Sequence, residues 1–239
     1  MELGEIIRFK ELKYASLGLF LFSLFLIPFN TTLSTLFMFA VVGLWSRVPA
    51  FLSSFTKDSE IIDFLSFVIS ISLGGLAGGL FGCLLMLFSR IFAPLEYPGY
   101  TIKDAVALFV SGISAPFIFF LTGGNMLLSM YGFTVVRYII YILLTAFFEP
   151  QWMMLELGYC FLGIFTSYLS NTIMISVFGD FTTNILKTGI GFNFSIFVFI
   201  FIVLFFVFFT KIIEILKFKK KPSKKTLWEI SKESKYFSL

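Results

Sequence analysis

The sequence predicts an all-α fold, a polytopic transmembrane helix bundle of about six spans. Of the 239 residues, 58% are hydrophobic and 13% are charged, and the mean hydropathy is +0.96. Soluble domains are about 45–50% apolar and about 25% charged, so this chain has too few charges to cover a water-facing surface. A transmembrane helix takes roughly 20 residues, which leaves room for about six or seven spans in one domain. We expect the bundle to cover residues 1–216 and a basic tail to cover residues 217–239.

The first apolar run, residues 15–46, is too long for one ordinary span. As a single helix it would reach about 48 Å, against about 30 Å of hydrocarbon. Pro28, Phe29, Asn30 and Thr31 interrupt it. The run therefore forms one long kinked helix or a tight hairpin of two short helices. Residues 47–63, with apolar side chains along one helical face, form an interfacial helix or an ordinary loop.

Five further apolar runs predict spans, and their short connections predict that successive helices are antiparallel neighbours. The spans are expected at approximately 64–92, 103–122, 126–147, 152–178 and 190–217.

Basic residues predict the orientation, because short flanks rich in Lys or Arg stay in the cytoplasm. Arg8, Lys10 and Lys13 precede the first run, and eight lysines lie between positions 217 and 235. We expect both termini in the cytoplasm, in the plasma membrane, with residues 15–46 crossing once. A double crossing of that segment gives seven spans. Counting back from the C-terminus places the 90–103 loop inside and residues 47–63 outside.

A row of glycines predicts a close helix contact. These glycines recur at spacings of four residues, so that one helix face lacks side chains and a neighbouring backbone can approach. The neighbour is either another helix of this chain or a helix of a membrane partner subunit. The helix-packing residues are Gly74, Gly75, Gly78, Gly79 and Gly82.

Arg137 lies near the middle of the 126–147 run, where a charge is costly and therefore informative. It needs a partner, for which Glu156, Asp104 and Asp180 are the candidates. A guanidinium holds a carboxylate or a phosphate with two parallel hydrogen bonds. Arg137 is therefore the first candidate for contact with an anionic ligand, and a structural ion pair or bonding to backbone carbonyls is the alternative.

A second polar group gathers at the predicted outer side. It comprises Asn171, the segment 179–187 with Asp180 and Asn184, and the turn at Asn125. Together these residues form either a rim for a small polar solute or ordinary turns and helix caps. The candidate ligand-binding residues are thus Arg137, Glu156, Asn171, Asp180, Asn184 and Asn125.

Several kinds of chemistry are disfavoured. The chain has no histidine, the commonest general base and an important metal ligand. Cys83 and Cys160 show no CxxC spacing. We find no nucleotide loop and no nucleophile with a base, so we expect no catalytic residue, no metal, no cofactor and no nucleic-acid partner. An enzymatic role stays open, and a non-enzymatic role is favoured.

Over roughly residues 64–190 the chain resembles the substrate-binding S components of energy-coupling-factor vitamin transporters. The resemblance rests on about six helices, the glycine-rich packing at Gly74 to Gly82, polar turns at the outer face and the lack of a soluble domain. It implies a solute binder that works with a coupling membrane protein and two cytoplasmic ATPases. No substrate motif matches residue by residue.

Two other functions fit the sequence. One is a structural or assembly subunit that uses the glycine face and the basic tail as contact surfaces. The other is a lipid-modifying membrane enzyme in which Arg137 binds a phosphate. A polar cavity near Arg137 or near residues 179–187 would favour the binder. An exposed glycine face would favour the subunit, and a cleft open sideways to lipid would favour the enzyme.

Overall fold

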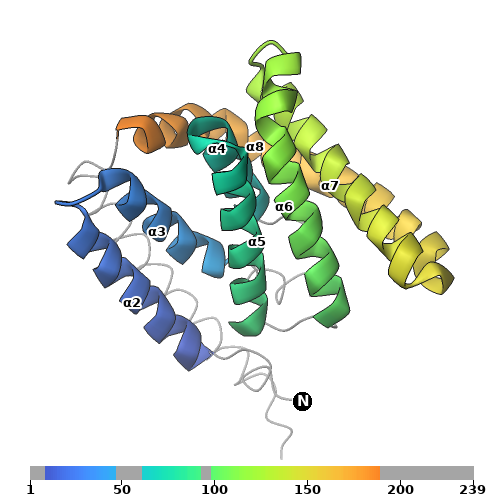
Figure 1. The fold of residues 1–239 in the computed structure, drawn as a ribbon, viewed down its shortest axis with the longest axis horizontal. Coiled ribbons are helices and arrows are strands. Elements are labelled where there is room, and N and C mark those ends of the chain that lie inside the picture. The colour runs from blue at the N-terminus through green and yellow to red at the C-terminus, as the bar shows by residue number, and fades with distance from the viewer. Residues whose placement is uncertain (1–8, 47–60, 93–97, 189–239) are drawn as a thin grey trace, which may run out of the picture. The chain divides into compact units, whose positions relative to one another are not determined.

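The computed structural model describes residues 9–46, 61–92 and 98–188, all within one compact unit that spans Met1–Ile190. These ranges contain α-helices, one short 3₁₀-helix and no β-strand (Figure 1), so the predicted all-α class is confirmed. The elements are α2 (Phe9–Leu26), α3 (Thr31–Leu44), α4 (Ile61–Leu73), α5 (Gly75–Phe92), α6 (Pro98–Leu121), α7 (Met126–Phe148), η3 (Pro150–Trp152) and α8 (Met153–Thr188).

The first apolar run forms a hairpin of two helices. Pro28 lies in the turn between α2 and α3, and the side chain of Asn30 caps α3 by accepting from the backbone N–H of Leu33 at 2.9 Å. Ser23 and Ser34 each donate to the backbone carbonyl of the other, at 2.9 and 2.7 Å, which fixes an antiparallel pair. The single long helix is therefore wrong, and the hairpin alternative is right.

The predicted span 64–92 is also wrong as one helix, because α4 and α5 are separate and pack against each other. Gly74 lies between them with φ of 106°, a conformation that favours glycine because it has no Cβ. The chain folds back here: Ser66 Oγ donates to the carbonyl of Gly78 at 2.9 Å. Gly74 makes the turn, and no atom lies within 4 Å of where its Cβ would be.

The other four glycines of the row lie against helices of the same chain. Cβ atoms added to Gly78 and Gly82 would meet Ser66 and Ser70 of α4, whereas those added to Gly75 and Gly79 would meet the backbone of α6. Both glycine faces are thus covered inside the bundle.

The polar segment 179–187 is helical rather than a loop, since α8 continues to Thr188. The hydroxyls of Thr182 and Thr183 donate to the backbone carbonyl of Gly179 at 3.0 and 2.8 Å. Both polar side chains are therefore hydrogen-bonded within the helix. The predicted last span, 190–217, and the basic tail lie outside the described residues, as does most of the predicted interfacial segment 47–63.

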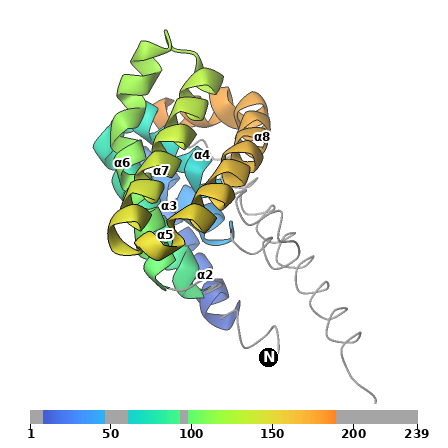
Figure 2. The ribbon, with the colours of Figure 1, turned by 90° about the vertical axis from the view of Figure 1, so that its right-hand side faces the viewer.

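Helix α4 lies at the centre of the packing. Its residues from Ile62 to Ser70 are all buried, and it packs against α3, α5, α6, α7 and α8. Figure 2, turned by 90°, shows α7 between α6 and α8, and it packs against both. Phe67 of α4 contacts Phe133 of α7 with ring centroids 5.7 Å apart, both side chains being fully buried.

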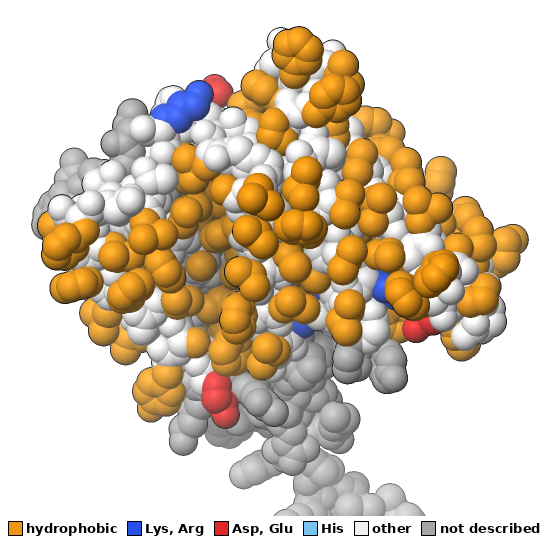
Figure 3. Space-filling model, viewed as in Figure 1, with side chains coloured by type: hydrophobic (Ala, Val, Ile, Leu, Met, Phe, Trp, Pro, Cys, Tyr) orange, Lys and Arg blue, Asp and Glu red, His pale blue; other side chains and the backbone are white. Residues whose placement is uncertain are grey.

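The surface carries many large apolar side chains. The face in Figure 3 is covered largely by hydrophobic groups with few charges between them. In the described part of the chain, four helices are long and apolar enough to cross a membrane: Gly75–Phe92, Gly99–Leu121, Met126–Phe148 and Pro150–Lys187. These features are those of an integral membrane protein, in which lipid is the solvent.

Candidate functional site

Four charged side chains are linked through the interior of the bundle. Arg137 on α7 donates to Asp63 on α4 and, through Nη2, to Oδ1 of Asp104 on α6 at 3.2 Å. The other oxygen of Asp104 accepts from Nη2 of Arg90 on α5. We call these four residues the ion-pair chain. It connects α4, α5, α6 and α7.

The ion-pair chain is deeply buried and balanced in charge. The side chains of Asp63, Arg90 and Arg137 are 0%, 4% and 6% exposed, whereas that of Asp104 is 18% exposed. Two cations and two anions make the group neutral as a whole. Charges in the membrane interior are tolerated when they pair with one another, and they frequently mark solute or ion pathways.

Lys103, the residue before Asp104, is the centre of a second charged group. Its Nζ donates to Oε2 of Glu149 at 2.7 Å and to Oγ1 of Thr145 at 3.2 Å. The ammonium also lies 4.5 Å from the ring centroid of Tyr100 and 5.2 Å from that of Tyr141. An ammonium over aromatic faces is attracted by the ring quadrupoles. Lys103 is thus held by a carboxylate, a hydroxyl and two rings.

Tyr141 connects this second group to Glu156. Its hydroxyl donates to Oε2 of Glu156 at 3.3 Å. Tyr141 follows Arg137 by one helical turn, so that Glu156 meets α7 about 6 Å closer to its C-terminal end than Arg137 does. Both charged groups lie toward the end of the bundle where α5 and α7 finish and α6 and α8 begin.

The structure places the predicted Arg137 in the interior, with 5% of the residue exposed. Of its three predicted partners, Asp104 contacts it. Glu156 bonds to Tyr141 instead, and Asp180 is exposed on α8.

Two members of the polar group predicted at the outer side, Asn125 and Asn171, make local hydrogen bonds. Asn125 caps α7 by accepting from the N–H of Leu128 at 3.0 Å, after two glycines with positive φ. Asn171 is buried and donates to Ser167 Oγ at 3.0 Å on its own helix. Asp180 and Asn184 are exposed on α8. These residues do not belong to the ion-pair chain.

Sequence reasoning missed Asp63, Arg90, Lys103 and Glu149 as site residues. Each lies near an end of an apolar run, where a charge is ordinarily assigned to a loop or to a topology signal. The available signal was that side chains of both charge signs flank successive runs, which permits pairing between helices.

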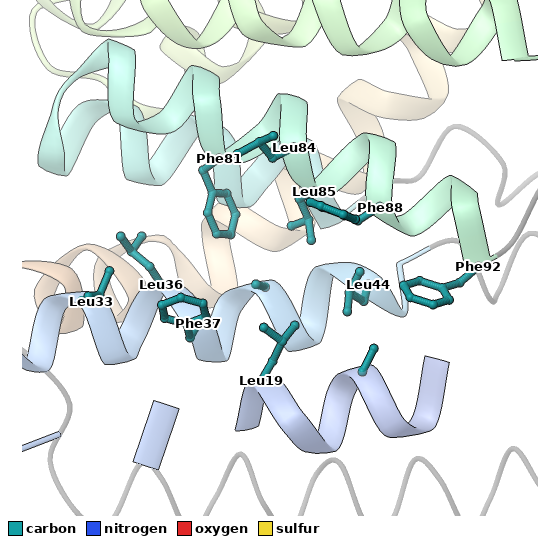
Figure 4. Close-up of a pocket in the computed structure, with 12 residues that line it drawn as sticks. Leu19, Leu33, Leu36, Phe37, Leu44, Phe81, Leu84, Leu85, Phe88 and Phe92 are labelled. Carbon is teal, nitrogen blue, oxygen red and sulfur yellow. The ribbon is translucent and has the colours of Figure 1, made fainter. Parts of the chain in front are cut away.

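An apolar groove of about 590 Å³ lies between the α2–α3 hairpin and α5. Figure 4 shows Phe81 of α5 pointing toward Leu36 and Phe37 of α3, and Phe92 of α5 beside Leu44 of α3. All twelve residues that line it are apolar, so it can accommodate hydrocarbon and supplies no group for acid–base chemistry.

The described residues contain no group of three or more His, Cys, Asp or Glu side chains placed to hold a metal ion. Comparison with models of protein families, with curated proteins and with solved structures finds no match to this chain.

Proposed function

We propose that this protein is a membrane component that binds a small solute for transport, and that the solute binds at the ion-pair chain. The observation that carries the proposal is the burial of Arg137 between carboxylates from two other helices. Ionisable groups inside a membrane are expensive to keep, and they commonly serve a solute or ion pathway.

The two competing functions have less support. The glycine face, the expected docking surface of a structural subunit, is covered by α4 and α6 of the same chain. The groove beside α5, which is the feature nearest to a lipid-facing cleft, is lined by apolar groups alone. It can hold an acyl chain but offers no catalytic side chain.

The resemblance to S components of energy-coupling-factor transporters gives the proposal its specific form. A component of this kind binds its solute by itself and depends on partner subunits for energy. Under this proposal the lipid-facing helix surfaces are available for a coupling membrane protein.

Native mass spectrometry of the gently purified protein tests the proposal. We expect a retained small molecule of defined mass on the parent protein and its loss from Arg137→Lys, because lysine cannot reproduce the bidentate geometry of a guanidinium. Lys187→Arg, at an exposed position on α8, is the matched control and should keep the molecule.

Size-exclusion chromatography must show that Arg137→Lys still folds. A parent protein that carries no small molecule but copurifies with a protein at fixed stoichiometry would instead establish the subunit function.

A further inference from the structure

The carboxylate of Asp104 accepts hydrogen bonds from two buried guanidinium groups. One of its oxygens accepts from Arg90 and the other from Arg137. Arg90 also donates to Thr101 Oγ1 at 3.4 Å, so a hydroxyl lies beside the same position. Two guanidiniums on one carboxylate, one of them also bonded to a hydroxyl, form a set suited to a small oxyanion, because guanidinium donors match the oxygens of carboxylates and phosphates.

The two carboxylates of the ion-pair chain differ in exposure. Asp63 is fully buried on α4, whereas the side chain of Asp104 is 18% exposed and is the most exposed of the four. If Asp104 turns away, Asp63 still balances one arginine and the other keeps an uncompensated positive charge. An incoming anion with one negative charge restores neutrality. Leaving that charge unmatched in the interior would be strongly unfavourable.

We propose that Asp104 holds the place of a small water-soluble anion, whose carboxylate or phosphate group displaces it and binds to Arg90 and Arg137. This inference rests on the proposed function and names its solute class. Lys103 is engaged by Glu149 and by two tyrosine rings. It therefore stays outside the exchange, which involves Asp104, the two arginines and the anion.

Anion titration of the full-length protein in detergent tests the inference, with acetate and inorganic phosphate as probes and melting temperature as the readout at constant ionic strength. The parent protein should show a saturable stabilisation by at least one probe. Asp104→Asn should respond at concentrations lower by about tenfold or more, since the competing carboxylate is gone and one charge-assisted hydrogen bond has roughly that value.

Arg90→Lys tests whether the anion binds at the position of the Asp104 carboxylate. Added to Asp104→Asn, it should remove the gain in anion affinity, whereas Lys187→Arg in the same background should keep it. If Asp104→Asn does not fold, the parent protein decides: its saturable response must weaken in Arg90→Lys and persist in Lys187→Arg.

Four outcomes overturn the inference. Saturation in Asp104→Asn without any response in the parent would make Asp104 a permanent structural counter-ion. A response that only anionic lipid elicits would replace the soluble anion by a headgroup. A retained solute without an anionic group would refute the claim that the solute is an anion, while leaving the proposed function intact. Absence of both a retained solute and an anion response would refute both.

Discussion

At the scale of residues, charged side chains pair across helices within the described part of the bundle. A buried pair is weak evidence for stability in itself, but removal of one partner leaves the other charge uncompensated. Arg137 illustrates this point, because its two carboxylate partners come from α4 and α6. Each side chain of the ion-pair chain therefore depends on a partner from another helix.

Asp63→Asn should destabilise the protein by about 3 kcal/mol, because it removes the fully buried partner of Arg137 and leaves Asp104 to balance two arginines. Thermal or denaturant unfolding in detergent measures the loss. Asp180→Asn makes the same chemical change at an exposed position on α8 and should be nearly neutral. Equal effects of the two variants would contradict the structural role assigned to Asp63.

At the scale of elements, two tight hairpins organise the N-terminal half of the described bundle. Polar residues close the first: beyond the paired serines, Trp45 Nε1 donates to Ser16 Oγ at 2.8 Å. Glycine closes the second, through the positive φ of Gly74 and the close approach of Gly78 to α4. In membranes, small residues and interhelical hydrogen bonds serve for association because apolar side chains gain little by leaving lipid.

Alanine at position 78 should cost about 1–3 kcal/mol, because the added Cβ would lie 2.5 Å from the carbonyl oxygen of Ser66 and α4 would have to move. Gly158→Ala on α8 is the matched control, since nothing lies within 4 Å of that site. There alanine should be neutral or stabilising by up to about 1 kcal/mol, owing to its better helix propensity. A lower melting temperature is therefore expected for Gly78→Ala, and an unchanged or higher one for Gly158→Ala. Destabilisation by both substitutions would contradict the packing assigned to Gly78.

At the scale of the whole molecule, the two hairpins alter the predicted path of the chain, and we predict that its orientation in the membrane is preserved. The α2–α3 hairpin and the fold at Gly74 each add one reversal to the predicted path. Because two added reversals cancel, we predict that the start of α2 and the end of α5 lie on the same side, which the basic residues predict to be the cytoplasm. The same counting predicts that the end of α3 and the start of α4 lie on that side as well, whereas the outer side was expected for residues 47–63.

Labelling with a membrane-impermeant maleimide checks this orientation in a variant with Cys83 and Cys160 replaced by alanine. A cysteine inserted between Gly123 and Gly124 should react in intact cells, whereas Gln151→Cys should react after permeabilisation alone. The Lys103–Glu149 pair joins the start of α6 to the end of α7, so that position 151 shares its side with the basic flank of α6. The reverse labelling pattern would invert the topology.

The sequence by itself determined the class of the protein. The balance of apolar and charged residues is a sum over local composition, and it decides whether water or lipid must surround the chain. The same reasoning placed Arg137 in the interior, since exposure of its charge to lipid is costly at that depth. It also predicted a close helix contact at the glycine row.

Only the tertiary structure decided which residues meet. Asp63 lies 74 positions from Arg137, and their pairing depends on α4 packing beside α7, which no local pattern encodes. Gly74 shares the spacing of a packing glycine, yet it makes a turn, because glycine fits both a close contact and a positive φ. Composition is additive along the chain, whereas helix reversals and ion pairs arise from contacts between segments far apart in sequence.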